Sequence, residues 1–180
     1  HRGIRPSSAW QLAKAKAGSG LSDLTESRTV NSFGQPTSIT DPRGNVTTIT
    51  YDPTHGGVLT ETGPAVGGIA PVKRYAYVQK FAWTKNAAGS FAQAALPVWL
   101  VAEERTCSAT ATVGNACAGG SADEVVVTYD YGPSSGPNNL QVRGKVVTAN
   151  GVSLRICYGY DRFGNKISET SPRAGLTSCP

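Results

Sequence analysis

The stretch VNSFGQPTSITDPRG at Val30–Gly44 has a near copy toward the other end of the chain, YDRFGNKISETSPRAG at Tyr160–Gly175. A shift of 130 positions aligns the two stretches in register over 14 residues without a gap. A second shift, of 21 positions, carries Val30-Asn31 onto Tyr51-Asp52. The sequence therefore predicts a fold assembled from repeated short units. The 130-residue shift matches Phe33-Gly34 with Phe163-Gly164, Ser38 with Ser168, Thr40 with Thr170, and Pro42-Arg43 with Pro172-Arg173.

Each unit has the same order of residue types: Tyr-Asp, a short turn that ends in Gly, a strand, and a turn with Pro or Gly. The dipeptide occurs as Tyr51-Asp52, Tyr129-Asp130 and Tyr160-Asp161. We expect the Tyr ring to pack on the sheet and the Asp to accept hydrogen bonds from turn amides, while Gly supplies a positive φ. One such unit cannot bury its apolar face alone, so neighbouring units should pack together.

The segments between the turns have the composition and alternation of strands. Asn150-Gly151 favours a type I′ turn, so 142–149 and 152–160 should form a hairpin. The fold class predicted is all-β, with antiparallel hairpin repeats in a curved meander sheet. Further runs rich in β-branched and aromatic residues lie at 45–52, 73–83, 97–105 and 124–132. The alternation at the end of the hairpin predicts one buried face made of Val152, Leu154, Ile156, Tyr158 and Tyr160.

The chain divides into two predicted parts. Residues 1–20 include a possible N-cap at Ser8, good helix formers over Ala9–Ala17 and a possible stop at Gly18, so we expect an N-terminal arm or a short helix. Residues 21–180 should form the β-repeat domain, with 65–123 as a divergent or inserted region because the repeat pattern is absent there. The sequence contains no Met, so we expect a mature product or an excised piece.

Composition narrows the classes of protein. The 21 Gly and 11 Pro in 180 residues are typical of many short elements joined by turns. The net charge of +5 comes from scattered residues rather than a basic face, so we expect no nucleic-acid partner. The longest apolar run, Ala94–Ala102, is far shorter than the ~20 residues that span a bilayer, so we expect no membrane span.

The four cysteines, Cys107, Cys117, Cys157 and Cys179, permit three full pairings. The stretch from Cys107 to Cys117 is typical of a small disulfide-closed loop, and Cys157 and Cys179 would then pair by elimination. Two such bonds indicate maturation in an oxidising compartment. Four reduced cysteines in a cytosolic chain remain the alternative.

These residues together resemble the YD or RHS repeat family. Its units run from Tyr-Asp through a Gly turn to a second turn that ends in Gly, and successive units are spaced by about 21 residues. The resemblance is strong over 30–64 and good over 124–175, where Tyr129-Asp130 begins a divergent copy. It implies a β-sheet that winds into a shell around a toxin or another cargo, or an extracellular scaffold. A chain of this size would supply a segment of such a wall, without the toxin.

Few side chains are candidates for catalysis, metal binding or ligand binding. His55 lies beside a turn with no second His or Cys at ligand spacing, so we interpret it as a solvated turn residue, and we expect no cofactor and no metal. In a strand the two members of Glu103-Glu104, and likewise of Asp123-Glu124, point to opposite faces, so neither pair can act together on one substrate atom. We therefore interpret these four acids as exposed charges at strand ends. Tyr75 and Tyr77, beside Lys73-Arg74, mark the first place to look for a binding surface.

The leading hypothesis is a non-enzymatic structural protein, a segment of a secreted or cell-surface bacterial RHS-repeat protein. Its partners would be other repeats of the same or a larger protein, through homo-association into a filament or docking into a cage, because unpaired sheet edges accept further strands. The alternative is a secreted carbohydrate-binding or adhesion module that contacts cell-surface glycans.

Overall fold

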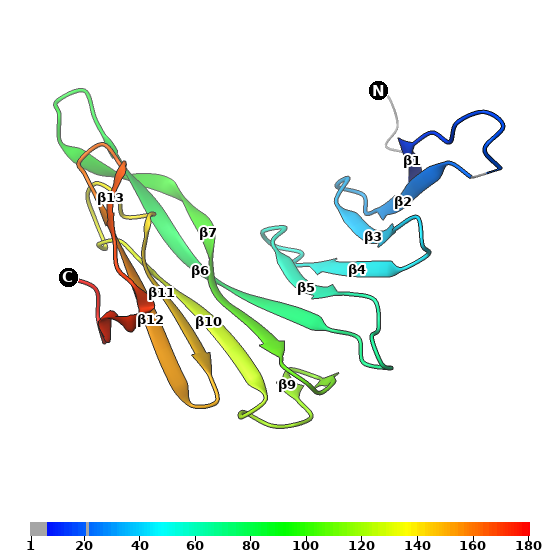
Figure 1. The fold of residues 1–180 in the computed structure, drawn as a ribbon. Coiled ribbons are helices and arrows are strands. Elements are labelled where there is room, and N and C mark those ends of the chain that lie inside the picture. Colours follow the sequence, from blue (N-terminus) through cyan, green and yellow to red (C-terminus); the bar gives the residue numbers. More distant parts are fainter. Residues whose placement is uncertain (1–6, 21) are drawn as a thin grey trace. The chain divides into compact units, whose positions relative to one another are not determined.

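The computed structural model describes residues 7–20 and 22–180, which form two compact units, His1–Lys73 and Arg74–Pro180. Each unit consists of antiparallel strands that follow one another in the sheet in the order of the chain (Figure 1). The predicted fold class, an all-β antiparallel meander, is confirmed. The predicted boundary between residues 1–20 and a single repeat domain stays a prediction.

The first unit is a meander of five strands, joined by tight turns. Each strand pairs antiparallel with the next one along the chain. Its strands are β1 (Ser7–Ala13), β2 (Leu24–Val30), β3 (Pro36–Thr40), β4 (Val46–Tyr51) and β5 (Val58–Thr62).

The short helix expected near the N-terminus is wrong for the part that is described. Ser7–Ala13 is strand β1, and it pairs with β2 from Ser7 opposite Thr29 to Ala13 opposite Leu24. The helix propensity of isolated residues is a weak preference, and backbone pairing with an existing strand outweighs it. Residues 1–6 of the predicted arm lie outside the described residues.

The second unit is a meander of longer strands. The predicted hairpin is confirmed, because β11 (Val142–Ala149) and β12 (Val152–Tyr160) pair antiparallel across Asn150 and Gly151, with φ of 50° and 74°. A small hairpin of β8 (Thr112–Val113) and β9 (Ala116–Cys117) lies between β7 and β10 in the chain. The other strands are β6 (Val72–Lys85), β7 (Phe91–Cys107), β10 (Glu124–Tyr131) and β13 (Lys166–Glu169), and a 3₁₀ turn, η1 (Pro172–Ala174), follows β13.

Residues 65–123, where the repeat pattern is absent, also form antiparallel strands. They contain the whole of the long β6–β7 hairpin, which pairs from Arg74 opposite Arg105 to Lys85 opposite Phe91. The 3₁₀ turn η1 is the longest helical element among residues 7–20 and 22–180, and nothing there is a helix able to cross a membrane.

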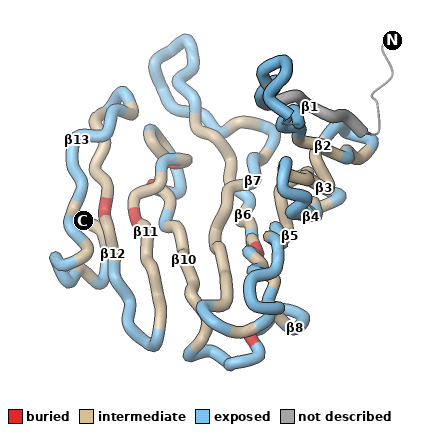
Figure 2. Tube along the Cα trace, turned by 45° about the vertical axis from the view of Figure 1, so that its right-hand side comes forward, coloured by how far each residue is buried: buried red, intermediate tan, exposed pale blue. Residues whose placement is uncertain are grey.

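Very few side chains of the described residues are deeply buried, as the scarce red segments in Figure 2 show. Among the residues whose burial is described, Cys117 and Cys157 are the buried hydrophobic ones, and no side chain there is less than 2% exposed. The expected buried face of β12 is therefore wrong in part: Val152 is 61% and Leu154 48% exposed, while Cys157 on the opposite face is 3% exposed. Alternation shows which residues share a face, but burial requires a second layer over that face.

Candidate functional site

The turns of the first unit share one hydrogen-bond arrangement around a leading Asn or Asp. The Oδ1 atom of Asn31 accepts hydrogen bonds from the backbone N–H of Phe33 and of Gln35, both at 3.0 Å. Asp41 accepts in the same way from Arg43 at 2.8 Å and Asn45 at 2.9 Å. In both turns the leading residue's own N–H donates to the carbonyl four residues on, at 2.9 Å. The side chain thus satisfies amides that the turn takes out of the sheet.

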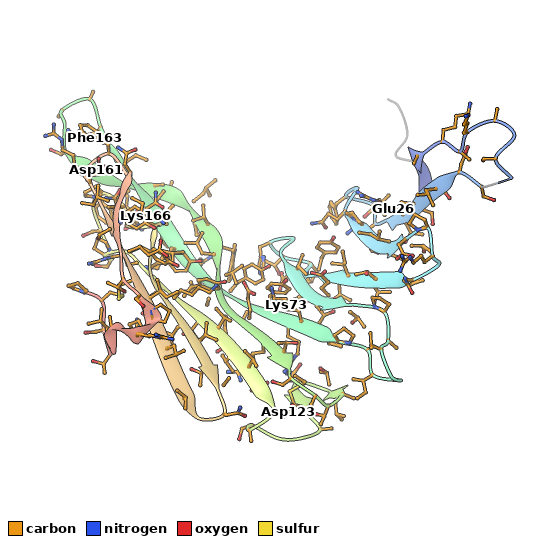
Figure 3. All side chains as sticks on the ribbon, viewed as in Figure 1. Glu26, Lys73, Asp123, Asp161, Phe163 and Lys166 are labelled. Atoms are coloured by element: carbon orange, nitrogen blue, oxygen red, sulfur yellow. A yellow bond between two sulfur atoms is a disulfide. The ribbon has the colours of Figure 1, made fainter. Side chains whose placement is uncertain are left out.

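The copy in the second unit repeats this arrangement almost bond for bond. Asp161 accepts from Phe163 N–H at 2.8 Å and from Asn165 N–H at 3.0 Å. Its Oδ2 accepts from Asn165 Nδ2 at 2.9 Å, as Asp41 Oδ2 does from Asn45 Nδ2 at 2.8 Å. Figure 3 shows Asp161 and Phe163 at the turn that joins β12 to β13. The two sequence copies are therefore copies of one hydrogen-bonded structure.

The Phe-Gly pair of each copy lies at the tip of the turn. Gly34 and Gly164 have φ of 81° and 87°, a conformation that favours Gly because it has no Cβ. The preceding residues are solvent-exposed, Phe33 by 81% and Phe163 by 75%. The shared Phe is thus an exposed side chain, and the shared Gly is the residue that the turn requires.

These hydrogen bonds keep the turn carboxylates charged. The side-chain amide of Asn165 is the largest cause of a pKa of Asp161 below its ordinary value, and Asn45 has the same effect on the pKa of Asp41. Hydrogen bonds to the ionised form favour it, so both carboxylates are acceptors at neutral pH.

The turn at Asp52 is one residue longer and contains His55. Asp52 accepts from the N–H groups of Thr54 at 2.7 Å and His55 at 3.1 Å, which lower its pKa, with Thr54 the larger cause. His55 Nδ1 accepts from Gly57 N–H at 3.1 Å, and its Nε2 lies 3.6 Å from Asp52 Oδ2. The expectation of a solvated histidine is wrong, because the imidazole is only 9% exposed. The turn folds around this ring.

A tyrosine at the end of a strand ties that strand to the one before it. Tyr51 Oη donates to the carbonyl oxygen of Pro36 at 2.7 Å, and Tyr160 Oη donates to that of Val142 at 2.8 Å. Each hydroxyl thereby satisfies a carbonyl at the start of the preceding strand. The tyrosine and the adjacent Asp form one unit, with the ring across two strands and the carboxylate in the turn.

The third Tyr-Asp dipeptide does not occupy the equivalent position. Tyr129 and Asp130 lie inside β10, where Asp130 pairs with Gly144 and forms an ion pair with Arg155. The structural counterpart of Tyr160 is Tyr131, whose hydroxyl donates to the carbonyl of Val101 at 2.7 Å.

Gly132 takes the place of the turn Asp after Tyr131, and its N–H donates to Gln141 O at 2.8 Å. A Cβ at this position would overlap the Asn138 carbonyl, so the packing of the long turn excludes Asp. The signal in the sequence was Tyr131-Gly132 directly before the Pro- and Gly-rich turn.

Neighbouring turns also contact each other. Gln35 Nε2 donates to Gly56 O at 2.8 Å, and Asn138 Nδ2 donates to Asp161 O at 2.7 Å. In the first unit an open groove of about 530 Å³ lies between the two joined turns and is lined by Phe33, Tyr51 and His55 among others. Within each unit, a hydrogen bond thus joins two neighbouring turns at the same end of their strands.

Both expected disulfide bonds are present. Cys107 is bonded to Cys117 and Cys157 to Cys179. The Asp123 carboxylate lies near the first pair, as one of three potential metal ligands, but the two sulfur atoms are bonded to each other. Asp123 instead accepts from the N–H groups of Ala109 at 2.8 Å and Thr110 at 3.0 Å. These atoms hold the loop together.

An ion-pair cluster lies beside that loop. Glu124 accepts from Arg74 Nη2 at 2.7 Å and from Arg105 Nη1 at 2.6 Å, and Arg74 also donates to the carbonyl of Asn115. Burial would raise the pKa of Glu124, but the two guanidinium groups lower it overall. The expectation of exposed strand-end charge is wrong for Glu124, which is 13% exposed. Sequence reasoning missed this cluster because Arg74 and Arg105 lie directly opposite each other only in the register of the β6–β7 pair, which the sequence alone does not show.

Tyr75 and Tyr77, the predicted binding surface, are half-buried residues of β6. Tyr75 lies opposite Glu104 and Tyr77 opposite Val101 in the pairing with β7. Their use by a glycan stays a prediction.

Fold and turns together define a class of protein: an antiparallel meander in which a unit made of a tyrosine and an Asx turn recurs. The family model described as RHS Repeat matches residues 31–65, so this part of the chain is similar to the repeat that the sequence pattern indicated. The match includes the turns that begin at Asn31, Asp41 and Asp52.

One similar solved structure is titled "Crystal Structure of TcdB2-TccC3-Cdc42". The similarity has a TM-score of 0.49 and 19% sequence identity, and it covers 91% of this chain. The chain spans 7% of the length of that solved chain. The comparison with curated proteins finds no match.

Proposed function

We propose that this chain is a structural segment of a larger RHS-repeat protein, in which it forms part of a β-sheet wall. The observation that carries the proposal is a sheet of repeated units with almost no interior of its own. Asx turns close the β2–β3, β3–β4 and β12–β13 hairpins, and Tyr51 and Tyr160 tie their strands to the preceding ones. Yet apolar side chains such as Leu154 stay 48% exposed. Apolar area of this kind favours association with a further layer or a neighbouring segment.

We infer a non-enzymatic role, which the hydrogen bonds of the polar side chains support. The turn carboxylates of Asp41, Asp52 and Asp161 accept hydrogen bonds from their own turns. His55 accepts from a backbone amide in its turn. Groups engaged in this way support the backbone, and we assign them that role.

We further propose that the protein works outside the cytosol, as a secreted or cell-surface bacterial protein. The two disulfide bonds support this location, because such bonds form and persist in oxidising compartments. The partners that we propose are other repeats, of a second copy of the chain or of the larger protein, joined in a cage or a filament.

Light scattering after size exclusion, over a range of protein concentrations, tests this proposal. We expect a mass that rises with concentration, and a Leu154→Ser variant that needs roughly tenfold more protein to associate, since burying a leucine is worth about 1.5–3 kcal/mol. Val113→Ser is the matched control, because Val113 is 65% exposed but lies in the small β8–β9 hairpin. A monomer at every concentration, or equal effects of the two substitutions, contradicts the proposal.

A further inference from the structure

The two sequence copies take different paths after their shared strand. In the first copy the turn from Asp41 to Asn45 leads into β4, which pairs with β3. The 130-residue shift places Ser171–Gly175 on that turn and Leu176, Thr177 and Ser178 on Val46, Thr47 and Thr48 of β4. The residue types match, an aliphatic residue followed by two hydroxyl residues. Yet 176–178 is not a strand, and η1 replaces the turn.

The turn residues explain part of this difference. Ser171 stands where the first copy has Asp41, and its Oγ accepts from Arg173 N–H at 3.2 Å. The carboxylate of Asp41 accepts from Arg43 N–H, from Asn45 N–H and from Asn45 Nδ2. Ala174 stands at the position of Gly44, which has a φ of 82°. A Cβ disfavours that conformation, and the positive φ is found instead at Gly175, at 65°.

The second disulfide explains the rest. Cys179 aligns with Ile49 of β4, but it is bonded to Cys157 of β12. The Cys179 sulfur lies over Gly144 of β11, where an added Cβ would come within 3.0 Å of it. A shallow pocket between this segment and the sheet is lined by Leu176 and Thr177 together with Val146 and Arg155. The segment that resembles β4 is therefore held on β11 and β12.

The outer edge of β13 consequently has no strand beside it among the described residues. Glu169 occupies the position of Ile39, which lies opposite Thr47 in the β3–β4 pair. The N–H of Asp41 donates to the carbonyl oxygen of Asn45. Along an antiparallel ladder every second residue pair is hydrogen-bonded, and Ile39–Thr47 is the second pair from Asp41–Asn45, so Ile39 and Thr47 form such a pair. The equivalent backbone groups of Glu169 lack that partner.

We propose that residues 171–179 are a stop in the repeat. Ala174 and the Cys157–Cys179 bond hold Leu176–Ser178 off β13 and leave the outer edge of β13 as an open strand-acceptor site. The occupant that fits this edge is the chain's own Leu176–Ser178. It would pair Thr170 with Leu176, Glu169 with Thr177 and Ser168 with Ser178, as β4 pairs with β3. The Lys166–Glu169 ion pair on β13 supports the part of the proposal that this edge is open, because charged side chains protect an open edge from unwanted strands.

Amide hydrogen exchange, read residue by residue by NMR, tests the proposal. In the unmodified chain we expect slow exchange at Ile39 and fast exchange at Glu169. The variant Cys157→Ser/Cys179→Ser frees the segment and leaves the Cys107–Cys117 bond intact, and adding Ala174→Gly restores the residue of the first copy. In this triple variant we expect exchange at Glu169 and Thr177 to slow at least tenfold, and less in the double variant.

Thr177→Pro in the triple variant is the control, because proline lacks the N–H that would donate to the Glu169 carbonyl. Without this bond the pair with β13 should not form, and Glu169 should return to fast exchange. Slow exchange at Glu169 in the unmodified chain would overturn the proposal without any variant. Fast exchange at Glu169 in a triple variant whose β11–β12 amides stay protected would overturn it as well. Slowing that persists with proline at 177 would show a different occupant, such as a second copy, and would also overturn the assignment.

Discussion

The hydroxyl of Tyr160 donates a hydrogen bond to the carbonyl oxygen of Val142 at 2.8 Å, which ties the end of β12 to the start of β11. Tyr51 makes the same bond to Pro36 at 2.7 Å in the first unit. The tyrosine of the repeat therefore joins neighbouring strands as well as packing on the sheet.

Tyr160→Phe should lower the free energy of unfolding by about 1 kcal/mol, because it leaves the Val142 carbonyl without its partner. Urea unfolding followed by tyrosine and tryptophan fluorescence measures the change. Tyr158→Phe is the matched control, since that ring lies two residues away and its hydroxyl donates no hydrogen bond within the described residues. Equal stability of the Tyr160→Phe variant and the control would contradict the role given to the hydroxyl.

Two substitutions of Asp161 distinguish the contribution of its hydrogen-bond acceptor to stability from that of its negative charge. Asp161→Asn keeps an oxygen for the amides of Phe163 and Asn165, as Asn31 does in the first copy. Asp161→Ala removes it. We expect the urea midpoint to fall in the order Asp, Asn, Ala, with the larger step at Ala. An alanine variant as stable as the asparagine variant would exclude the capping role.

Stability should fall in acid. The pKa values of Asp41, Asp52, Asp123 and Asp161 are lowered from an ordinary value of 3.8, and that of Glu124 from 4.5. A depressed pKa in the folded state means that the unfolded chain binds more protons, so the free energy of unfolding rises with pH in this range. The contribution is complete above the ordinary values and is lost as pH falls through the folded ones.

Urea midpoints measured from neutral pH down to below the ordinary values check this dependence. Asp161→Asn should lose less stability over the acid range than the unmodified chain, because one shifted carboxyl group is absent. A midpoint that rises as pH falls would contradict the prediction.

Opening the Cys107–Cys117 bond should loosen the loop that covers Arg74. Cys107→Ser/Cys117→Ser should cost about 2–4 kcal/mol of stability, the usual effect of losing a bond that closes a loop. Proteolysis within 108–116 should be faster in the variant than in the unmodified chain. A thiol titration of the unfolded, unreduced protein should find no free thiol, since all four cysteines are bonded. Four free thiols would contradict the pairing and the oxidising location.

The sequence was most informative where a local rule decides the structure. Asn150-Gly151 predicts its hairpin correctly because positive φ at two successive residues is a property of the turn itself. The Asx-x-Phe-Gly motif, with Asn31 in one copy and Asp161 in the other, likewise determines its own hydrogen bonds, because the side-chain oxygen reaches amides only two and four residues away. The prediction that a third unit begins at Tyr129-Asp130 was wrong because the position of that turn is not decided locally. Only the pairing of β10 with β7 and β11 shows that the turn starts after Tyr131.

The sequence by itself determined that this is an all-β chain of repeated hairpins, that the turn aspartates are acceptors, and that its cysteines suit two bonds. Only the tertiary structure decided that Leu154 is exposed, that Glu124 lies between two arginines, and that 176–178 leaves the sheet. The physical reason is range. Turn geometry and alternation depend on residues a few positions apart, whereas burial, ion pairs and strand edges depend on which distant segments meet.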